Sequence, residues 1–123
     1  THPVGYMIEH DTGTSLHARD SKPAPTFHEL ADAFDIDVGI LAFGSTGMIP
    51  DKATGEPTRT TWYSDETQIV EAAADLALDR LVPTHWDMWK GLTADPTALH
   101  DHVRSFDRPR RLDIVEIGDR IEL

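Results

Sequence analysis

The chain lacks several features that would identify whole classes of protein. Its 123 residues include no cysteine, which excludes disulfides and thiolate ligands, so any metal ion must be held by His, Asp and Glu. No apolar run approaches the roughly 18 residues of a membrane-spanning helix. The start, Thr1–Val4, has neither an initiator Met nor a signal-peptide pattern. We expect a cytoplasmic protein without a membrane partner, beginning inside a longer gene product or after processing.

Basic residues are also scarce. Lys and Arg number 11 against 22 Asp and Glu, which gives a formal net charge of −11. Because nucleic-acid phosphates need a positive surface, this balance excludes a nucleic-acid partner. The composition, 39% hydrophobic and 27% charged, is typical of a globular protein, and the length predicts a single domain over 1–123 with a core of its own.

Apolar periodicity predicts the element order ββαβαβαββ. We expect strands over 4–9, 15–18, 37–43 and 80–83, helices starting near residues 26, 65 and 95, and a closing hairpin of 112–117 with 120–123. A capping box, Thr26 with Glu29, is predicted to start the first helix. Residues 44–61, rich in Gly, Thr and Pro, are expected to form a long loop.

This order predicts an α+β fold, a mixed sheet with helices mainly on one face. The runs 38–43 and 81–83 are apolar on both sides, which is typical of strands covered on both faces. Either the three helices cover both faces sparsely, or a second polypeptide layer is missing from this chain, and we expect the missing layer.

Two segments place a potential metal ligand where an apolar run gives way to a polar loop. They are Leu16–Ser21, which contains Asp20, and Leu81–Asp87, which contains His85. Asp20 could simply end a hairpin and His85 could be an ordinary loop histidine, but the neighbouring Trp86 suggests a walled cleft. Two ligands are too few for a catalytic ion, so the pattern indicates half of a metal site.

Three segments together resemble a known family: HARDS at 17–21, IDVGIL at 36–41 and VPTHWDMW at 82–89. The set is similar to the C-terminal half of the metallo-β-lactamase fold, in the branch of L-ascorbate-6-phosphate lactonase. That fold is an αββα sandwich, whose first half carries a His-x-His-x-Asp-His motif that is absent here. The resemblance implies that the chain is half of such a sandwich, and that its partner in an oligomer is the N-terminal half, as a separate chain or a missing segment.

The resemblance also implies roles for individual residues. Asp20 would bridge two divalent ions, Mn or Zn, and His85 would complete the coordination of one, with most ligands coming from the missing half. From the residues themselves, we expect His17 and Asp87 to orient these ligands. Arg19, Lys52 and Trp86 are the candidates for contact with a small-molecule substrate. For Lys52, an exposed position in a flexible loop is an equally supported interpretation.

The resulting hypothesis is a metal-dependent hydrolase of a lactone or related ester, active only with the missing half. Arg19 occupies a position where the family usually has Gly. This departure supports the alternative of a truncated or degenerate subunit that folds against a partner without catalysis. A third hypothesis is a phosphodiesterase-type hydrolase of the same fold.

Overall fold

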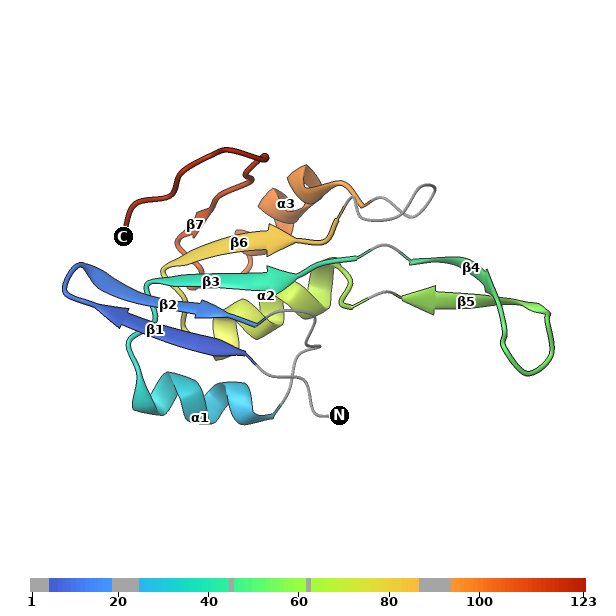
Figure 1. Cartoon of the computed structure of the whole chain (residues 1–123), viewed down its shortest axis with the longest axis horizontal. Helices are drawn as coiled ribbons and strands as arrows, with labels where there is room; N and C mark the ends of the chain where they lie inside the picture. The colour runs from blue at the N-terminus through green and yellow to red at the C-terminus, as the bar shows by residue number, and fades with distance from the viewer. Residues whose placement is uncertain (1–4, 19–24, 45, 62, 87–93) are drawn as a thin grey trace.

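The computed structural model describes residues 5–18, 25–44, 46–61, 63–86 and 94–123 (Figure 1). Its main sheet has five strands in the order β1-β2-β3-β6-β7. β1 pairs antiparallel with β2, whereas β2, β3, β6 and β7 are parallel. The strands are β1 (Tyr6–His10), β2 (Gly13–His17), β3 (Val38–Ala42), β6 (Arg80–Thr84) and β7 (Arg111–Leu112).

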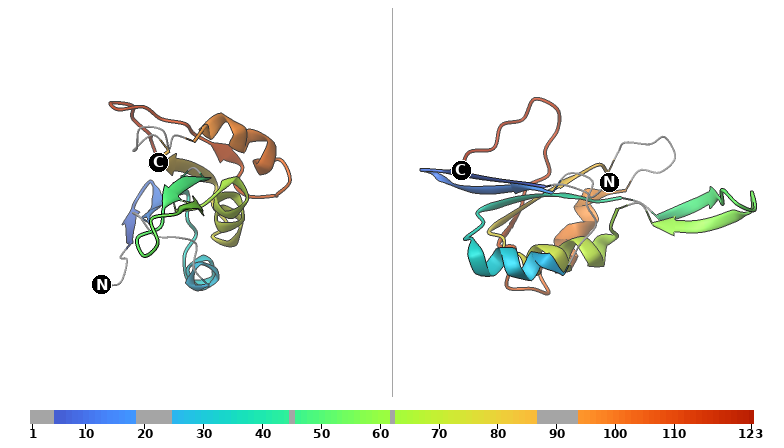
Figure 2. Two further views of the ribbon diagram at one scale, coloured as in Figure 1. Left: turned by 90° about the vertical axis from the view of Figure 1, so that its right-hand side faces the viewer. Right: turned by 60° about the horizontal axis from the view of Figure 1, so that its bottom comes forward.

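Three helices cover one face of this sheet (Figure 2, right). They are α1 (Thr26–Ala33), α2 (Glu66–Asp75) and α3 (Leu99–Val103), the last preceded by a 3₁₀ turn, η1 (Pro96–Ala98). The core lies between helices and sheet and is formed by Leu16, Leu41, Phe43 and Leu81 from the strands and their ends with Phe27, Ile69, Val70, Ala73 and Leu99 from the helices. The mixed sheet with helices on one face confirms the expected fold. Among the described residues, no helix has the length and apolar character needed to cross a bilayer.

Side-chain caps fix two of the predicted starts. Asp65 accepts a hydrogen bond from the backbone N–H of Gln68, and the Gln68 side chain accepts one from the N–H of Asp65. Asp95 accepts from Thr97, whose hydroxyl and then backbone N–H lower the pKa of this carboxyl. A lowered pKa means that the Asp95 cap stabilises the fold above the group's ordinary pKa and loses this effect as pH falls through the lowered value.

α2 ends in a Schellman motif. The N–H of Leu78 donates to the carbonyl of Ala73, and the N–H of Ala77 donates to that of Ala74. Ala77 adopts φ 50° at the position where this motif favours glycine. The motif turns Leu78 back onto Gly39 of β3, where a Cβ would lie only 2.3 Å from a Leu78 methyl. Glycine at 39 is therefore what lets the helix layer reach the centre of the sheet.

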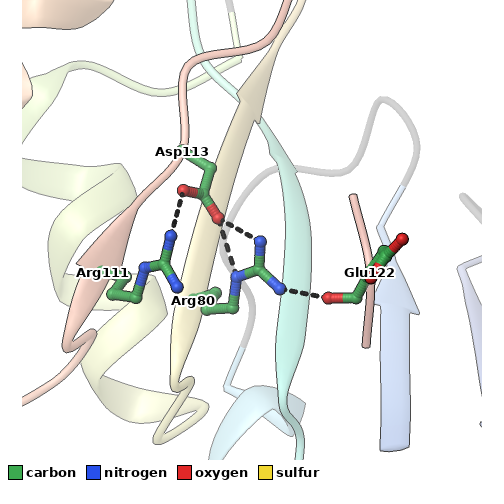
Figure 3. Close-up of polar contacts among 4 residues, drawn as sticks. All are labelled: Arg80, Arg111, Asp113 and Glu122. Carbon is green, nitrogen blue, oxygen red and sulfur yellow. Dashed lines mark hydrogen bonds and ion pairs between the residues drawn. The ribbon is translucent and has the colours of Figure 1, made fainter. Parts of the chain in front are cut away.

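The other face of the sheet is crossed by the last residues of the chain, 113–123, which we call the C-terminal strap. The N–H of Asp113 donates to the carbonyl of Leu81, and its carboxylate pairs with Arg80 at 2.7 Å (Figure 3). Arg80 also donates to the carbonyl of Glu122, while Leu123 lies against Gly13 at the start of β2. The strap thus extends from the β7 edge to β2, on the side away from the helices (Figure 2).

Three local predictions are wrong. The expected loop 44–61 contains a two-stranded hairpin, β4 (Thr46–Pro50) with β5 (Pro57–Thr61), because its threonines suit extended pairing. Thr26 is the first residue of α1 rather than its cap, and no side chain caps that helix. The closing hairpin is missing because only Arg111 and Leu112 pair, and the remainder follows the strap instead.

Replacement of Ala77 by Gly should raise the free energy of unfolding by about 0.5–1 kcal/mol, because Gly has no Cβ to strain a positive φ. The matched control is Ala74→Gly inside α2, which should lower it by about 1 kcal/mol. Urea denaturation of both variants measures the difference. Equal destabilisation by both would show that residue 77 is not left-handed.

Candidate functional site

The candidate site lies where the parallel strands end. Because β2, β3 and β6 run in the same direction, their carboxyl ends meet at one edge of the sheet (Figure 1). Such an edge is where open α/β sheets place their ligands. In the ladder, His17 of β2 stands beside Ile40 of β3, which stands beside Val82 of β6. His85 follows Val82 by three residues, the same sequence offset as that of Asp20 from His17.

His85 has an unusual backbone. Its φ is 66°, and that of Tyr63, on the segment entering α2, is 60°. The centroids of the two rings lie 5.0 Å apart with the ring planes tilted by 31°. Positive φ costs energy for residues with a Cβ, and such strain is found preferentially at functional sites. The ring contact between two strained residues therefore indicates a functional site at this edge, independently of any sequence motif.

Hydrogen bonds around the end of β3 hold the two segments in place. Thr84 donates its hydroxyl to the carbonyl of Leu41 at 3.2 Å, and its own carbonyl accepts the N–H of Phe43 at 2.8 Å. The buried hydroxyl of Ser64 donates to the carbonyl of Ala42 at 2.7 Å. His85 and Tyr63 are thus each adjacent to a residue bonded to the central strand.

An open cavity of about 570 Å³ lies beside His85. This is within the usual size range of small-molecule sites. Two segments supply its described lining: Pro83, Thr84, His85 and Trp86 at the end of β6, and Val115, Glu116 and Ile117 of the strap.

The structure brings some of the predicted site residues together. His85 and Trp86 both line the cavity, whereas His17 lies at the end of β2, which is separated from β6 by β3. Lys52 is exposed in the turn of the β4–β5 hairpin, which projects beyond the end of β3 (Figure 1), and it does not line the cavity. Arg19, Asp20 and Asp87 lie outside the described residues, so their predicted roles stay predictions.

The described residues do not form a complete metal site. No group of three or more His, Asp or Glu side chains among them could hold an ion. A catalytic ion needs about three protein ligands, so His85 fits only as a contribution to a shared site.

The sequence alone gives neither Tyr63 nor Glu116 a place in the site. The ring contact of Tyr63 with His85 depends on a positive φ that sequence does not reveal. Glu116 reaches the cavity only because the strap crosses the sheet, whereas its alternating sequence suggests a plain hairpin.

No protein-family model matches the chain. Two curated proteins with the same description do match it. It is 26% identical over 121 residues to a "UPF0173 metal-dependent hydrolase" of Desulforamulus reducens, covering 98% of this chain and 46% of that protein. A protein of the same description from an Exiguobacterium species is 28% identical, with 45% of its length covered. The chain spans about half the length of the curated relatives it matches.

Solved structures show which fold this is. The metallo hydrolase Igni18 of Ignicoccus hospitalis matches with a TM-score of 0.72 and 20% identity, over 94% of this chain and 43% of that one. The metallo-β-lactamase fold protein YhfI of Bacillus subtilis matches with a TM-score of 0.61 and 16% identity, over 96% and 44%. The chain has the fold of roughly half a metallo-β-lactamase-fold protein. This half-fold ends its parallel strands at the edge where His85 lies.

The strain at His85 can be measured by a pair of substitutions. Both His85→Gly and His85→Ala remove the ring and its contact with Tyr63, but only Ala keeps a Cβ at positive φ. The Gly variant should therefore be more stable than the Ala variant by about 0.5–1 kcal/mol in urea denaturation. If the Ala variant is equally or more stable, His85 does not have a left-handed backbone.

Proposed function

We propose that this chain contributes part of the metal site of a metal-dependent hydrolase. The observation that carries the proposal is the position of His85, strained and beside a cavity, at the shared edge of the parallel strands. The names of the relatives support a hydrolase. The chain spans less than half of them, so the activity is proposed for the complete assembly.

In this proposal His85 is a neutral imidazole ligand and Asp20 a carboxylate ligand. A bound pair of divalent ions would supply Lewis-acid activation of water and of the bond to be cleaved. The protein's part is to hold the imidazole at a fixed position. Thr84 does this by tying the end of β6 to β3, and Tyr63 packs its ring against that of His85. His17 and Asp87 are proposed to orient the ligands.

The proposed substrate is a lactone or related ester. Support comes from the cavity, whose described lining is largely apolar, with Trp86 and Pro83 beside His85. Such a surface suits the ring or acyl part of an ester. Arg19 and Lys52 stay candidates for contact with an anionic group of the substrate. Lys52 can make such a contact only if the β4–β5 turn reaches a site formed by another part of the assembly.

The proposed partner is a polypeptide that supplies the rest of the fold. On the sheet face away from the helices, Tyr6 and Ile8 of β1 are 53% and 56% exposed, and Ile117 of the strap is fully exposed. Large apolar side chains gathered on one side favour association. A chain matching less than half of its relatives leaves enough missing sequence to cover that side.

A non-catalytic role is the second candidate. It is supported by the lack of any three-ligand group among the described residues. In that case Asp20 and His85 are remnants of a site, and the chain only folds against a partner.

In the complete assembly, Asp20→Ala and His85→Ala should each reduce ester hydrolysis by at least about 100-fold, because each removes a metal ligand. Metal content, measured by mass spectrometry of the desalted protein, should fall in parallel. His28→Ala is the matched control, since His28 is exposed on α1 and lies at the surface beside Asp75. Activity retained in either ligand variant would exclude the assignment.

Native mass spectrometry of chelator-free material separates the two candidate functions. We expect a complex of this chain with a second polypeptide and about two divalent ions per pair. A metal-free single chain would instead support the non-catalytic subunit.

A further inference from the structure

The β4–β5 hairpin projects from the strand-end edge without a covering layer. Within the described part of the chain its two strands pair only with each other, from Thr46 opposite Thr61 to Pro50 opposite Pro57. Figure 1 shows the hairpin extending beyond the end of β3, away from the main sheet and its helices. An isolated two-stranded hairpin is only marginally stable in water. We therefore expect a surface of another molecule to cover it.

One face of the hairpin is suited to such a contact. Met48 lies opposite Arg59 and Pro50 lies opposite Pro57. Because paired residues two positions apart share a face, these four side chains lie together. All four are exposed, and Met48 is 62% exposed. This patch, which we call the arm face, combines three apolar side chains with one cation.

The edges of the hairpin are less suited to binding. The N–H of Asp51 donates to the carbonyl of Glu56 at 2.8 Å, so the backbone groups of the next pair, Pro50 with Pro57, point outward. Neither proline has an N–H to donate to an added strand. The hairpin is therefore better suited to contact through the arm face than to extension of its sheet.

Two cations of the hairpin are available to a partner. Lys52 and Arg59 are exposed, and neither forms an ion pair within the described residues. The carboxylate of Asp51 instead accepts the N–H groups of Ala53 and Thr54, at 2.8 and 3.1 Å. The arginines outside the hairpin that do pair with carboxylates are Arg80, Arg104, Arg108, Arg110 and Arg111.

The hairpin also differs from the rest of the chain in net charge. Residues 46–61 contain two acidic and two basic side chains, so this segment is neutral and the formal charge of −11 lies in the remainder. The part of one copy that another copy repels least is therefore its hairpin.

The ends of α1 and α2 carry charge complementary to that of the arm. Asp32 lies in the last turn of α1, Asp35 follows that helix, and Asp75 is the last residue of α2. Neither last turn contains a basic residue, although the carbonyl end of a helix favours cations and disfavours carboxylates. Nε2 of His28 in α1 lies 3.4 Å from Oδ1 of Asp75, so the two helices lie side by side. We call Asp32, Asp35 and Asp75 the acidic helix ends.

The arm and the acidic helix ends lie toward opposite edges of the sheet. The hairpin leaves from the carboxyl end of β3, whereas α1 and α2 lead into the starts of β3 and β6 (Figure 1). The metal ions proposed at His85 belong to the carboxyl edge, so they do not neutralise the acidic helix ends. The covering partner proposed above lies on the sheet face away from the helices. Both surfaces therefore stay available in the complete assembly.

We propose that the β4–β5 hairpin is an arm that binds the acidic helix ends of a second copy of this chain. The arm supplies the cations that two helix ends lack, and every copy has both surfaces. Because the two surfaces are different and lie at opposite edges, the contact joins copies head to tail rather than as a symmetric pair. This inference does not rest on the proposed function.

A photo-crosslinker on the arm maps the contact. Ala53→Cys, in the exposed turn of the hairpin, gives a single attachment point for benzophenone maleimide, because the chain has no cysteine of its own. The labelled chain is irradiated with an isotopically labelled, unmodified chain, and peptides joined between the two are identified by mass spectrometry. We expect cross-links to residues 26–35 and 66–79 of the second copy. Cross-links to its hairpin, to β1 or to the strap instead, or to no part of it, would overturn the inference.

Substitutions test whether charge holds the contact. Arg59→Gln should lower the affinity between copies about three- to fivefold, which is the size expected for one exposed ion pair. Raising the salt concentration from about 0.05 M to about 0.5 M should weaken the association of the unmodified chain. The yield of cross-links as a function of protein concentration measures both effects.

A double variant of the target surface gives a result that a general charge effect would not. Asp32→Asn with Asp35→Asn should weaken the association about as much as Arg59→Gln, although it reduces the net negative charge that drives copies apart. The free energy of unfolding should not fall, because a helix end disfavours these carboxylates. Tighter association of this variant would contradict the inference.

Arg120→Gln is the matched control for Arg59→Gln. Arg120 is an exposed cation of the strap that forms no ion pair within the described residues, so both variants lose one positive charge. The control should leave the affinity between copies unchanged. An equal loss in the two variants, or tighter association at high salt, would overturn the inference, because either result means that only the net charge of the copies matters.

Discussion

The pairing of β3 with strands on both sides is the constraint on which the rest of the molecule depends. β3 has no charged side chain, and four of its five residues are buried. Its parallel ladders with β2 and β6 bring segments that are far apart in sequence to one edge. The same strand receives the side-chain hydrogen bonds of Ser64 and Thr84 just before it ends. β3 is therefore the element that connects the segments carrying His17, Tyr63 and His85.

The two faces of that strand are covered in different ways. On the helix side, Leu78 fills the space that Gly39 leaves, and the apolar side chains form one continuous core. On the other side, the covering segment is irregular and is held through charged groups, chiefly Arg80 with Asp113 (Figure 3). A largely buried ion pair adds little net stability, because removing both charges from water offsets their attraction. The strap is therefore well placed over the sheet without being part of the core.

The sequence was sufficient to predict elements whose signals are local and strong. The helix starts expected near residues 65 and 95 are confirmed by the caps Asp65 and Asp95, and the strand expected over 37–43 is confirmed by β3. The failures occur where partners are distant. Residues 114–123 alternate like strands, but a strand forms only if a neighbour completes its ladder, and within the described chain none does. His85 could be chosen as a candidate ligand from its context, whereas its left-handed backbone and its contact with Tyr63 follow from tertiary packing.

The base of the β4–β5 hairpin has a consequence for how this fold can vary. The N–H of Gly44 donates to the carbonyl of Ser64 at 3.0 Å, so the chain leaves the sheet and returns to it at directly bonded positions. The rest of the domain therefore does not restrict the length of the segment between Gly44 and Ser64. A shorter connection, or a much larger one, could join the same two residues at little cost in loop-closure entropy. This junction is a natural point for the fold to accept inserted modules beside its strand ends while the sheet and helices stay as they are.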